Sequence, residues 1–148
     1  MSTYTQILYQ IVFSTKHRKP VLNPVNRPEL FKYIWGILKE KKCHLYRING
    51  VEDHIHIVTQ VHPTIALAAL IKEIKVASTN YIKANNLFPD FEQWQVGYAA
   101  FTYAYSARQD LIEYVKNQEE HHKSKTYLEE LIALLHEHQI VFEPRYLD

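Results

Sequence analysis

Cysteine is almost absent from this chain of 148 residues, in which Cys43 is the only one. A single thiol excludes an internal disulfide and any zinc site that is built from several cysteines. Cys43 is therefore expected to be a small buried hydrophobic residue.

Long apolar runs are absent as well, and no stretch approaches the roughly 18 residues that a membrane-spanning helix needs. The first residues lack the basic and apolar regions of a signal peptide. We therefore expect a soluble, cytoplasmic protein with no membrane partner.

Net charge is also small, because 17 Lys and Arg residues nearly balance 16 Asp and Glu residues and leave +1 at neutral pH. This balance argues weakly against a protein that coats nucleic acid. The distribution is uneven, with nine basic and two acidic residues in 1–51 but three basic and seven acidic residues in 119–148. One basic face could meet phosphates, although an uneven solvated surface explains the pattern equally well.

The chain length predicts a single domain over 1–148, and no repeat or linker composition divides it. The expected elements follow from apolar periodicity and turn residues. They are a strand over 4–14, a helix over 27–42 that starts at a capping-box-like Asn26 and Glu29, a hairpin of 43–50 and 54–61 turning after Gly50, a helix from Pro63 to Ala84, a strand in 97–105, and helices over 107–122 and 126–138.

The first six elements follow the order strand, helix, strand, strand, helix, strand. This is the ferredoxin-like βαββαβ motif of the α+β class, an antiparallel four-stranded sheet with two helices on one face. Such a fold leaves the opposite sheet face free for a ligand or another subunit. The two C-terminal helices are additions to the motif.

Two histidines, His54 and His56, interrupt the apolar run HIHIVTQV. Residues two apart in a strand point to the same face, so both imidazoles project together while Ile55 and Ile57 enter the core. The pair could bind one metal ion, or it could be two solvated histidines on an exposed sheet face. A catalytic metal normally takes a third protein ligand and keeps a position open.

The helix expected over 107–122 could supply that ligand. Tyr114, Gln118 and His121 are spaced by four and three residues, which places them on one helix face. Taken alone, they could equally be a packing tyrosine and two solvated polar residues. The histidines of the tail are expected on a polar helix surface, with His121 or His122 a candidate accessory group of the site.

Five stretches together are more specific than the histidine pair. In chain order they are YQIVFSTKHRKPVL, GVEDHIHIV, LIKEIKVASTNYIK, WQVGYAAF and YVKNQ. They resemble the single-tyrosine HUH (His, hydrophobic, His) transposases of bacterial insertion sequences, including the REP-associated tyrosine transposases. The resemblance covers about residues 4–118, and the continuation EEHHKSKTYLEELIALL is similar to members with an extra C-terminal helix.

The resemblance implies a metal-dependent DNA strand transferase. By similarity His54 and His56 bind a divalent metal, Gln118 completes the protein ligands, and Tyr114 is the nucleophile. The metal would be Mg²⁺ or Mn²⁺, and imidazole ligands suit Mn²⁺ better. Cleavage would leave a 5′-phosphotyrosine and a free 3′-OH, which allows rejoining without ATP.

Members of the family act on single-stranded DNA near imperfect hairpins. One tyrosine per chain implies a homodimer, and in the family the tyrosine helix often docks on the partner's histidines, so the active site could be shared between subunits. The candidate DNA contacts are Lys16, Arg18, Lys19, Lys72, Lys75 and Ser78. Each of them also fits a solvated surface residue.

Other functions fit parts of the pattern. A domesticated REP-associated relative that processes scattered palindromes differs from a mobile transposase mainly in the flanking DNA. A non-catalytic ferredoxin-like nucleic-acid-binding dimer would leave His54 and His56 exposed and need no metal. A two-motif His-x-Thr/Ser phosphoesterase is disfavoured, because the chain has one histidine pair and no duplicated half.

Overall fold

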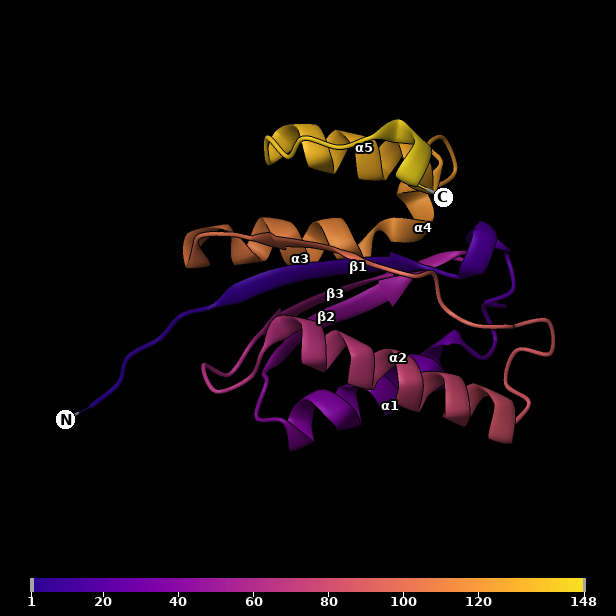
Figure 1. The fold of residues 1–148 in the computed structure, drawn as a ribbon, viewed down its shortest axis with the longest axis horizontal. Coiled ribbons are helices and arrows are strands. Elements are labelled where there is room, and N and C mark those ends of the chain that lie inside the picture. The colour runs from indigo at the N-terminus through magenta and orange to yellow at the C-terminus, as the bar shows by residue number, and fades with distance from the viewer. Residues whose placement is uncertain (1, 148) are drawn as a thin grey trace.

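A computed structural model describes residues 2–147 of the chain as a sheet with helices on both faces (Figure 1). The elements are β1 (Leu8–Ser14), η1 (Lys16–Arg18), α1 (Arg27–Glu40), β2 (Leu45–Gly50), β3 (His54–Gln60), α2 (Leu67–Ala84), β4 (Ala99–Thr102), η2 (Tyr105–Ala107), α3 (Arg108–Lys116), α4 (Gln118–His121), α5 (Tyr127–Glu137) and η3 (Pro144–Tyr146). The strand order is β2-β3-β1-β4 with antiparallel pairing throughout. The expected α+β fold with a ferredoxin-like sheet is confirmed.

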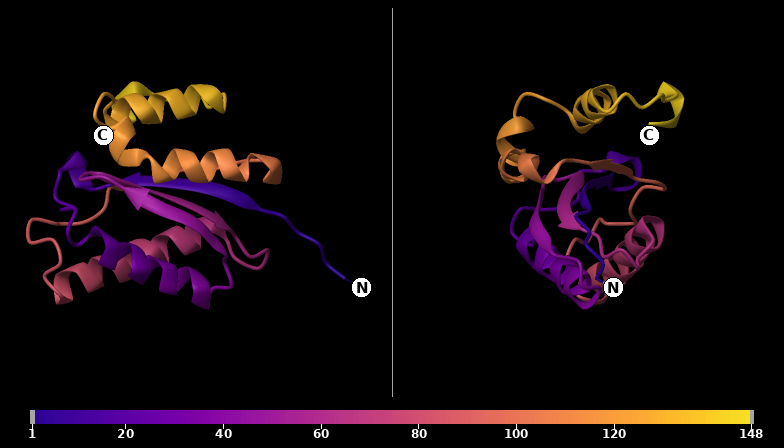
Figure 2. Two further views of the ribbon diagram at one scale, coloured as in Figure 1. Left: turned by 180° about the vertical axis from the view of Figure 1, so that it is seen from behind. Right: turned by 90° about the vertical axis from the view of Figure 1, so that its left-hand side faces the viewer.

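The sheet is the middle of three layers (Figures 1 and 2). Helices α1 and α2 cover one face, and α3, α4 and α5 lie over the other. The sequence led us to expect this second face to be free for a ligand or subunit. It is instead covered by the C-terminal helices of the same chain, because their apolar stripes need a partner surface.

The central strand β1 shows why the sheet needs a helical layer on each face. Ile11 and Phe13 join the core that α1 and α2 close, whereas Val12 packs on the other side against Phe101 and Leu131. A strand with apolar side chains on both faces is stable only when both faces are covered. The layer formed by α3 to α5 is therefore part of the folded core.

Strand β3 has a different chemical character on its two faces. Ile55 and Ile57 belong to the core beneath α1 and α2. His54 and His56 point to the opposite face, as the strand period predicted, yet both are fully buried. The alternative of two solvated histidines is therefore wrong for this structure.

The turn that joins β2 to β3 lies where the sequence predicts it, and Val51 N donates to His54 O across it at 3.1 Å. Glycine is needed at position 50, because a Cβ there would lie 2.3 Å from His54 O and 2.9 Å from Ile55 Cγ2. This close approach fixes the backbone that carries the first histidine.

Several element boundaries differ from the sequence prediction. The first strand begins at Leu8, and α1 ends at Glu40. The expected capping box at Asn26 is absent, because the Asn26 side chain donates instead to Leu87 O at 2.9 Å. Helix α5 does begin with a capping box, in which Thr126 and Glu129 bond each other's backbone N–H.

Two further elements are shorter than the sequence predicts. The second helix starts at Leu67 rather than Pro63, because His62 and Thr64 form a local turn with a 2.7 Å side-chain contact. Within the aromatic run, the strand is limited to Ala99–Thr102.

Two expectations from composition can also be compared with the structure. Cys43 is buried, as expected. Among residues 2–147, no helix combines the length and apolar character required to cross a membrane.

Gly50→Ala tests the close approach at the hairpin. The added Cβ would force the turn and the start of β3 apart, and such overpacking costs about 1–3 kcal/mol of unfolding free energy. Gly36→Ala is the matched control, because its Cβ meets nothing within 4 Å in the exposed middle of α1. We expect the control to be stabilised by about 0.5–1 kcal/mol. Urea denaturation curves measure both effects, and equal stability of the two variants would contradict the assignment.

Candidate active site

A buried carboxylate, that of Glu130 on α5, lies at the centre of a polar cluster on the second sheet face. Its Oε1 is 2.9 Å from His56 Nε2, 3.2 Å from His54 Nε2 and 3.1 Å from His122 Nε2. Its Oε2 accepts from Gln118 Nε2 at 2.9 Å and from the phenol of Tyr114. Five residues from β3, α3, α4 and the segment after α4 therefore converge on one side chain.

His54 is held from both sides of its ring. Its Nδ1 lies 2.7 Å from Asp53 Oδ1, and its Nε2 is 3.1 Å from Gln118 Oε1. Burial disfavours the charged imidazolium, but the carboxylates of Asp53 and Glu130 outweigh burial and raise the pKa of His54 to about 8. Its ring also packs 4.5 Å from that of Tyr127, centroid to centroid.

His56 is the more deeply desolvated histidine, and burial lowers its pKa even though Glu130 favours the charged form. Its Nδ1 lies 3.0 Å from the amide nitrogen of Gln10 on β1. The other end of that amide accepts from Tyr103 at 2.6 Å, and the Tyr103 hydroxyl lies 3.1 Å from His138 Nε2. A chain of polar groups therefore runs from His56 through the sheet face to α5.

Tyr114 and Gln118 do not lie on one uninterrupted helix. The expected helix over 107–122 breaks at Asn117, so α3 ends at Lys116 and α4 begins at Gln118. Asn49 of β2 explains the break, because its side-chain amide donates to Val115 O at 3.2 Å and Lys116 O at 3.0 Å. A side chain that satisfies the last carbonyls of a helix stabilises its end.

Both residues nevertheless reach the cluster. Gln118 is fully buried, whereas Tyr114 is partly buried with its ring centroid 6.0 Å from that of His56. Burial raises the pKa of the Tyr114 phenol well above its usual range, and the nearby charge of Glu130 adds to this. Tyr114 is therefore a protonated donor here.

Of the two accessory histidines, His122 enters the cluster. Its Nε2 lies 3.1 Å from both Gln118 Oε1 and Glu130 Oε1, and its Nδ1 is 2.6 Å from Lys125 O. His121 instead packs beside Tyr114, with ring centroids 4.7 Å apart.

The donor set fits a divalent cation. His54, His122 and Glu130 each offer a ligand atom, and these atoms lie within 4.8 Å of one another. Neighbouring ligands of one octahedral cation, at bonds of about 2.1 Å, lie about 3 Å apart. The separations of 2.9–3.2 Å among the imidazole nitrogens and the Gln118 and Glu130 oxygens match that spacing.

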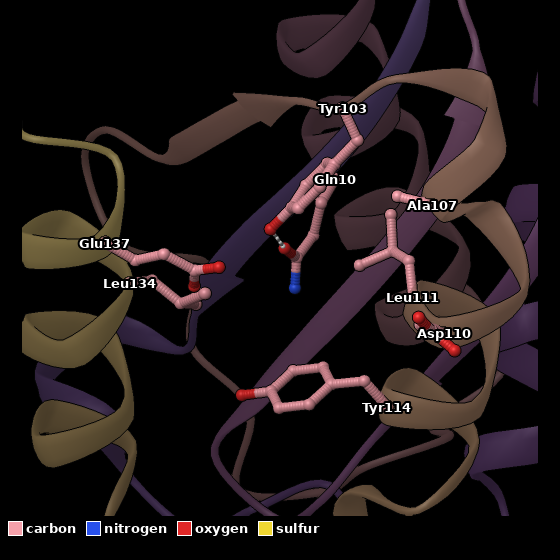
Figure 3. Close-up of a pocket in the computed structure, with 8 residues that line it drawn as sticks. All are labelled: Gln10, Tyr103, Ala107, Asp110, Leu111, Tyr114, Leu134 and Glu137. Carbon is pink, nitrogen blue, oxygen red and sulfur yellow. Dashed lines mark hydrogen bonds between the residues drawn. The ribbon is translucent and has the colours of Figure 1, made fainter.

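Two pockets flank the cluster. The first, of about 310 Å³, lies between α3, α5 and the sheet, and Tyr114 points into it beside Gln10 and Tyr103 (Figure 3). Asp110 and Glu137 also line it.

The second pocket, of about 350 Å³, lies on the other side of the cluster. Glu52, Asp53 and His122 line it together with Lys123 and Lys125. Its two lysines can attract phosphates, beside the two carboxylates, and the first pocket has no lysine in its lining.

Three of the candidate DNA contacts lie close together after β1, Lys16 and Arg18 in η1 and Lys19 directly behind it. Lys16 and Lys19 pair with Glu92, at 3.9 Å and 2.6 Å, and Arg18 donates to Leu147 O at 2.9 Å. The start of β3 is adjacent, since Thr15 N donates to Asp53 O at 2.9 Å. These residues are therefore near the cluster.

The candidates on α2 are placed differently, because α2 covers the sheet face opposite the cluster. Lys72 is exposed there. Lys75 is half-buried and donates to Gln95 O at 3.0 Å. Ser78 is fully buried, donates to Ile74 O and accepts from Trp94 Nε1. The expectation that Ser78 touches a DNA backbone is therefore corrected: its hydroxyl is used in the core.

Glu130 was not among the residues selected from the sequence. The signal was present, because Tyr127, Glu130, Leu131 and Leu134 share the buried face of α5. A carboxylate on an apolar helix stripe needs a buried partner.

Comparisons with known proteins agree with the fold. The family described as IS200-like transposase matches residues 3–118. A solved structure of a candidate transposase from Deinococcus radiodurans is 21% identical with a TM-score of 0.61, over 80% of this chain and 95% of that one. No curated protein matches the chain.

A second solved structure is that of a REP-associated tyrosine transposase bound to a REP hairpin. It is 13% identical with a TM-score of 0.60, over 82% of this chain and 74% of that one. At these identities the two structures show a shared fold. Since the family match extends from residue 3 to Gln118 at the candidate site, the chain belongs to the IS200-like transposases, a family of DNA-processing enzymes.

Proposed function

We propose that this transposase cleaves and rejoins single-stranded DNA near hairpin ends, with Tyr114 as the nucleophile and a divalent metal, Mg²⁺ or Mn²⁺, held by His54, His56 and Gln118. The whole of 1–148 would act as one domain in the cytoplasm. One observation carries the proposal: the phenol of Tyr114 and the imidazole of His56 contact the two oxygens of the same carboxylate, although 58 positions separate the residues.

The proposed cleavage exchanges one phosphodiester for another. The Tyr114 oxygen bonds to phosphorus as the bond to the 3′ oxygen breaks, the phenol loses its proton, and the leaving 3′ oxygen gains one. The products are a 5′-phosphotyrosine and a free 3′-OH, and attack by a 3′-OH reverses the step. No net hydrolysis occurs, so the bond remains available for rejoining.

The surroundings of Tyr114 determine what activation this step requires. Its raised pKa means that the phenol must lose its proton within the site. Glu130 orients the phenol, but contacts with His122, His54 and His56 hold the pKa of Glu130 far below its usual range despite burial, so it is a weak base. When bound, a divalent cation supplies positive charge that offsets charge on the phosphate and favours the phenolate.

The proposed DNA partner rests on the fold and the family together. The similar transposase named above was solved with a REP hairpin, and we propose a hairpin-bearing single strand for this chain. The second pocket, with Lys123 and Lys125, is the proposed path for its backbone. Two chains, each with one tyrosine, would cut two DNA ends as a homodimer.

The nucleophile assignment predicts a covalent intermediate. Wild-type protein with Mn²⁺ and labelled single-stranded hairpin DNA should give an adduct on a denaturing gel, and EDTA or His54→Ala should remove it. Tyr114→Phe should give no adduct while still binding DNA, because it loses only the hydroxyl. Tyr46→Phe is the matched control and should keep the adduct. An adduct that persists in Tyr114→Phe would place the nucleophile elsewhere.

Within the structure, the tyrosine and the histidines of one site come from the same chain. A mixture of Tyr114→Phe and His54→Ala chains should therefore give no adduct, because every site lacks either the nucleophile or a metal ligand. Exchange of the tyrosine helix between subunits would restore one complete site per mixed dimer. An adduct formed by the mixture, and by neither variant alone, would contradict assembly within one chain.

A further inference from the structure

We propose that His122 and Glu130 are additional ligands of the metal bound by His54, His56 and Gln118, so that the cation also fastens α5 to the sheet. This inference rests on the proposed function, because it assumes that a divalent cation binds at the histidine pair. It adds two ligands from the C-terminal segment, which lies beyond the 3–118 family match.

The hydrogen bonds of His54 determine which of its nitrogens is free. Nδ1 faces the carboxylate of Asp53 at 2.7 Å and must carry the proton, because an ionised carboxylate only accepts. In the neutral ring Nε2 then has a lone pair. Metal-binding histidines are commonly fixed by a carboxylate or a backbone carbonyl at the other nitrogen in this way.

His122 repeats the arrangement with a different partner. Its Nδ1 faces the carbonyl of Lys125 at 2.6 Å, and a carbonyl also only accepts. Nε2 of the neutral ring therefore carries a lone pair as well. Two histidines from separate parts of the chain thus present unprotonated nitrogens to the same space.

Among residues 2–147, the polar partners of these two nitrogens are oxygen acceptors. Gln118 Oε1 lies 3.1 Å from both Nε2 atoms, and Glu130 Oε1 lies 3.2 Å from that of His54 and 3.1 Å from that of His122. The Gln118 amide is oriented by its nitrogen, which donates to Glu130 Oε2 at 2.9 Å. When the two imidazoles are neutral, four atoms with free lone pairs thus converge on one space, which is the arrangement that a divalent cation needs.

His56 can join the same set. If Nδ1 accepts from the Gln10 amide nitrogen, Nε2 carries the proton and donates to Glu130. If the Gln10 amide is rotated by 180°, its oxygen accepts from Nδ1 and the Nε2 lone pair is free. Tyr103 and His138 can satisfy either orientation, because a hydroxyl both donates and accepts.

The buried charge of the Glu130 carboxylate also supports a bound cation. Glu130 is 2% exposed, and its ion-pair partners within residues 2–147 are His54, His56 and His122, with neither lysine nor arginine among them. A carboxylate buried this deeply needs positive charge beside it. A divalent cation compensates it, and five protein ligands leave one of six octahedral positions for water or DNA.

Direct Mn²⁺ titration of the full chain, followed by electron paramagnetic resonance of free Mn²⁺, tests the two added ligands. We expect Glu130→Gln, which keeps the side-chain shape, and His122→Ala each to weaken Mn²⁺ binding about tenfold or more, the range known for perturbed metal sites. Glu137→Gln and His136→Ala are the matched controls on exposed positions of α5 and should bind as wild type does.

Hydrogen exchange provides a second readout that does not depend on activity. Mn²⁺ should slow amide exchange across α5 in wild-type protein and in Glu137→Gln, but should have little effect in Glu130→Gln. Melting curves without Mn²⁺ show whether Glu130→Gln is folded. If Glu130→Gln is unfolded, the Mn²⁺ affinity of His122→Ala decides whether the C-terminal segment supplies a ligand.

The outcomes separate this inference from the proposed function. If wild-type protein binds Mn²⁺ and His54→Ala does not, while Glu130→Gln and His122→Ala bind normally, the added ligands are refuted and the proposed metal site stands. The cluster would then be held by protonated histidines alone. If wild-type protein binds no Mn²⁺, both proposals fail.

Discussion

The contact between the Glu130 carboxylate and the imidazoles of His54 and His56 is the interaction on which the candidate site depends. One oxygen contacts the sheet through the histidines, and the other receives the Tyr114 phenol and the Gln118 amide. Removing one partner of a buried charge pair typically costs about 3–5 kcal/mol. The position of the nucleophile relative to the histidines is therefore set by a side chain of α5.

This contact depends in turn on a strand with two different faces. The isoleucines of β3 anchor it in the core beneath α1 and α2, which fixes the direction of His54 and His56 on the other side. A slip of one residue would exchange the two sets of side chains. The antiparallel pairing of β3 with both β1 and β2 opposes such a slip. The rigid sheet thus supplies the histidines, and the helices supply the groups that meet them.

The sequence predicted those features of the candidate site that depend on the repeat of a single strand or helix. Strand alternation predicted the common face of His54 and His56, and helical spacing with the family resemblance selected Tyr114 and Gln118. It did not predict the break at Asn117, which depends on Asn49 from β2. Glu130 and His122 were harder to identify as partners, because their contacts arise only when α5 folds back over the sheet. Ser78 was misjudged since its burial depends on Trp94 from a distant loop.

Closure of the sheet face by α5 links the nucleophile, the histidines and the C-terminal segment in one buried cluster. The most direct measurement is an anomalous difference map from crystals of the protein grown with Mn²⁺. The account predicts one strong peak within bonding distance of His54, His56, Gln118, His122 and Glu130, with α5 in place. A peak bound by the two histidines while Glu130 points away, or no peak at the cluster, would contradict it.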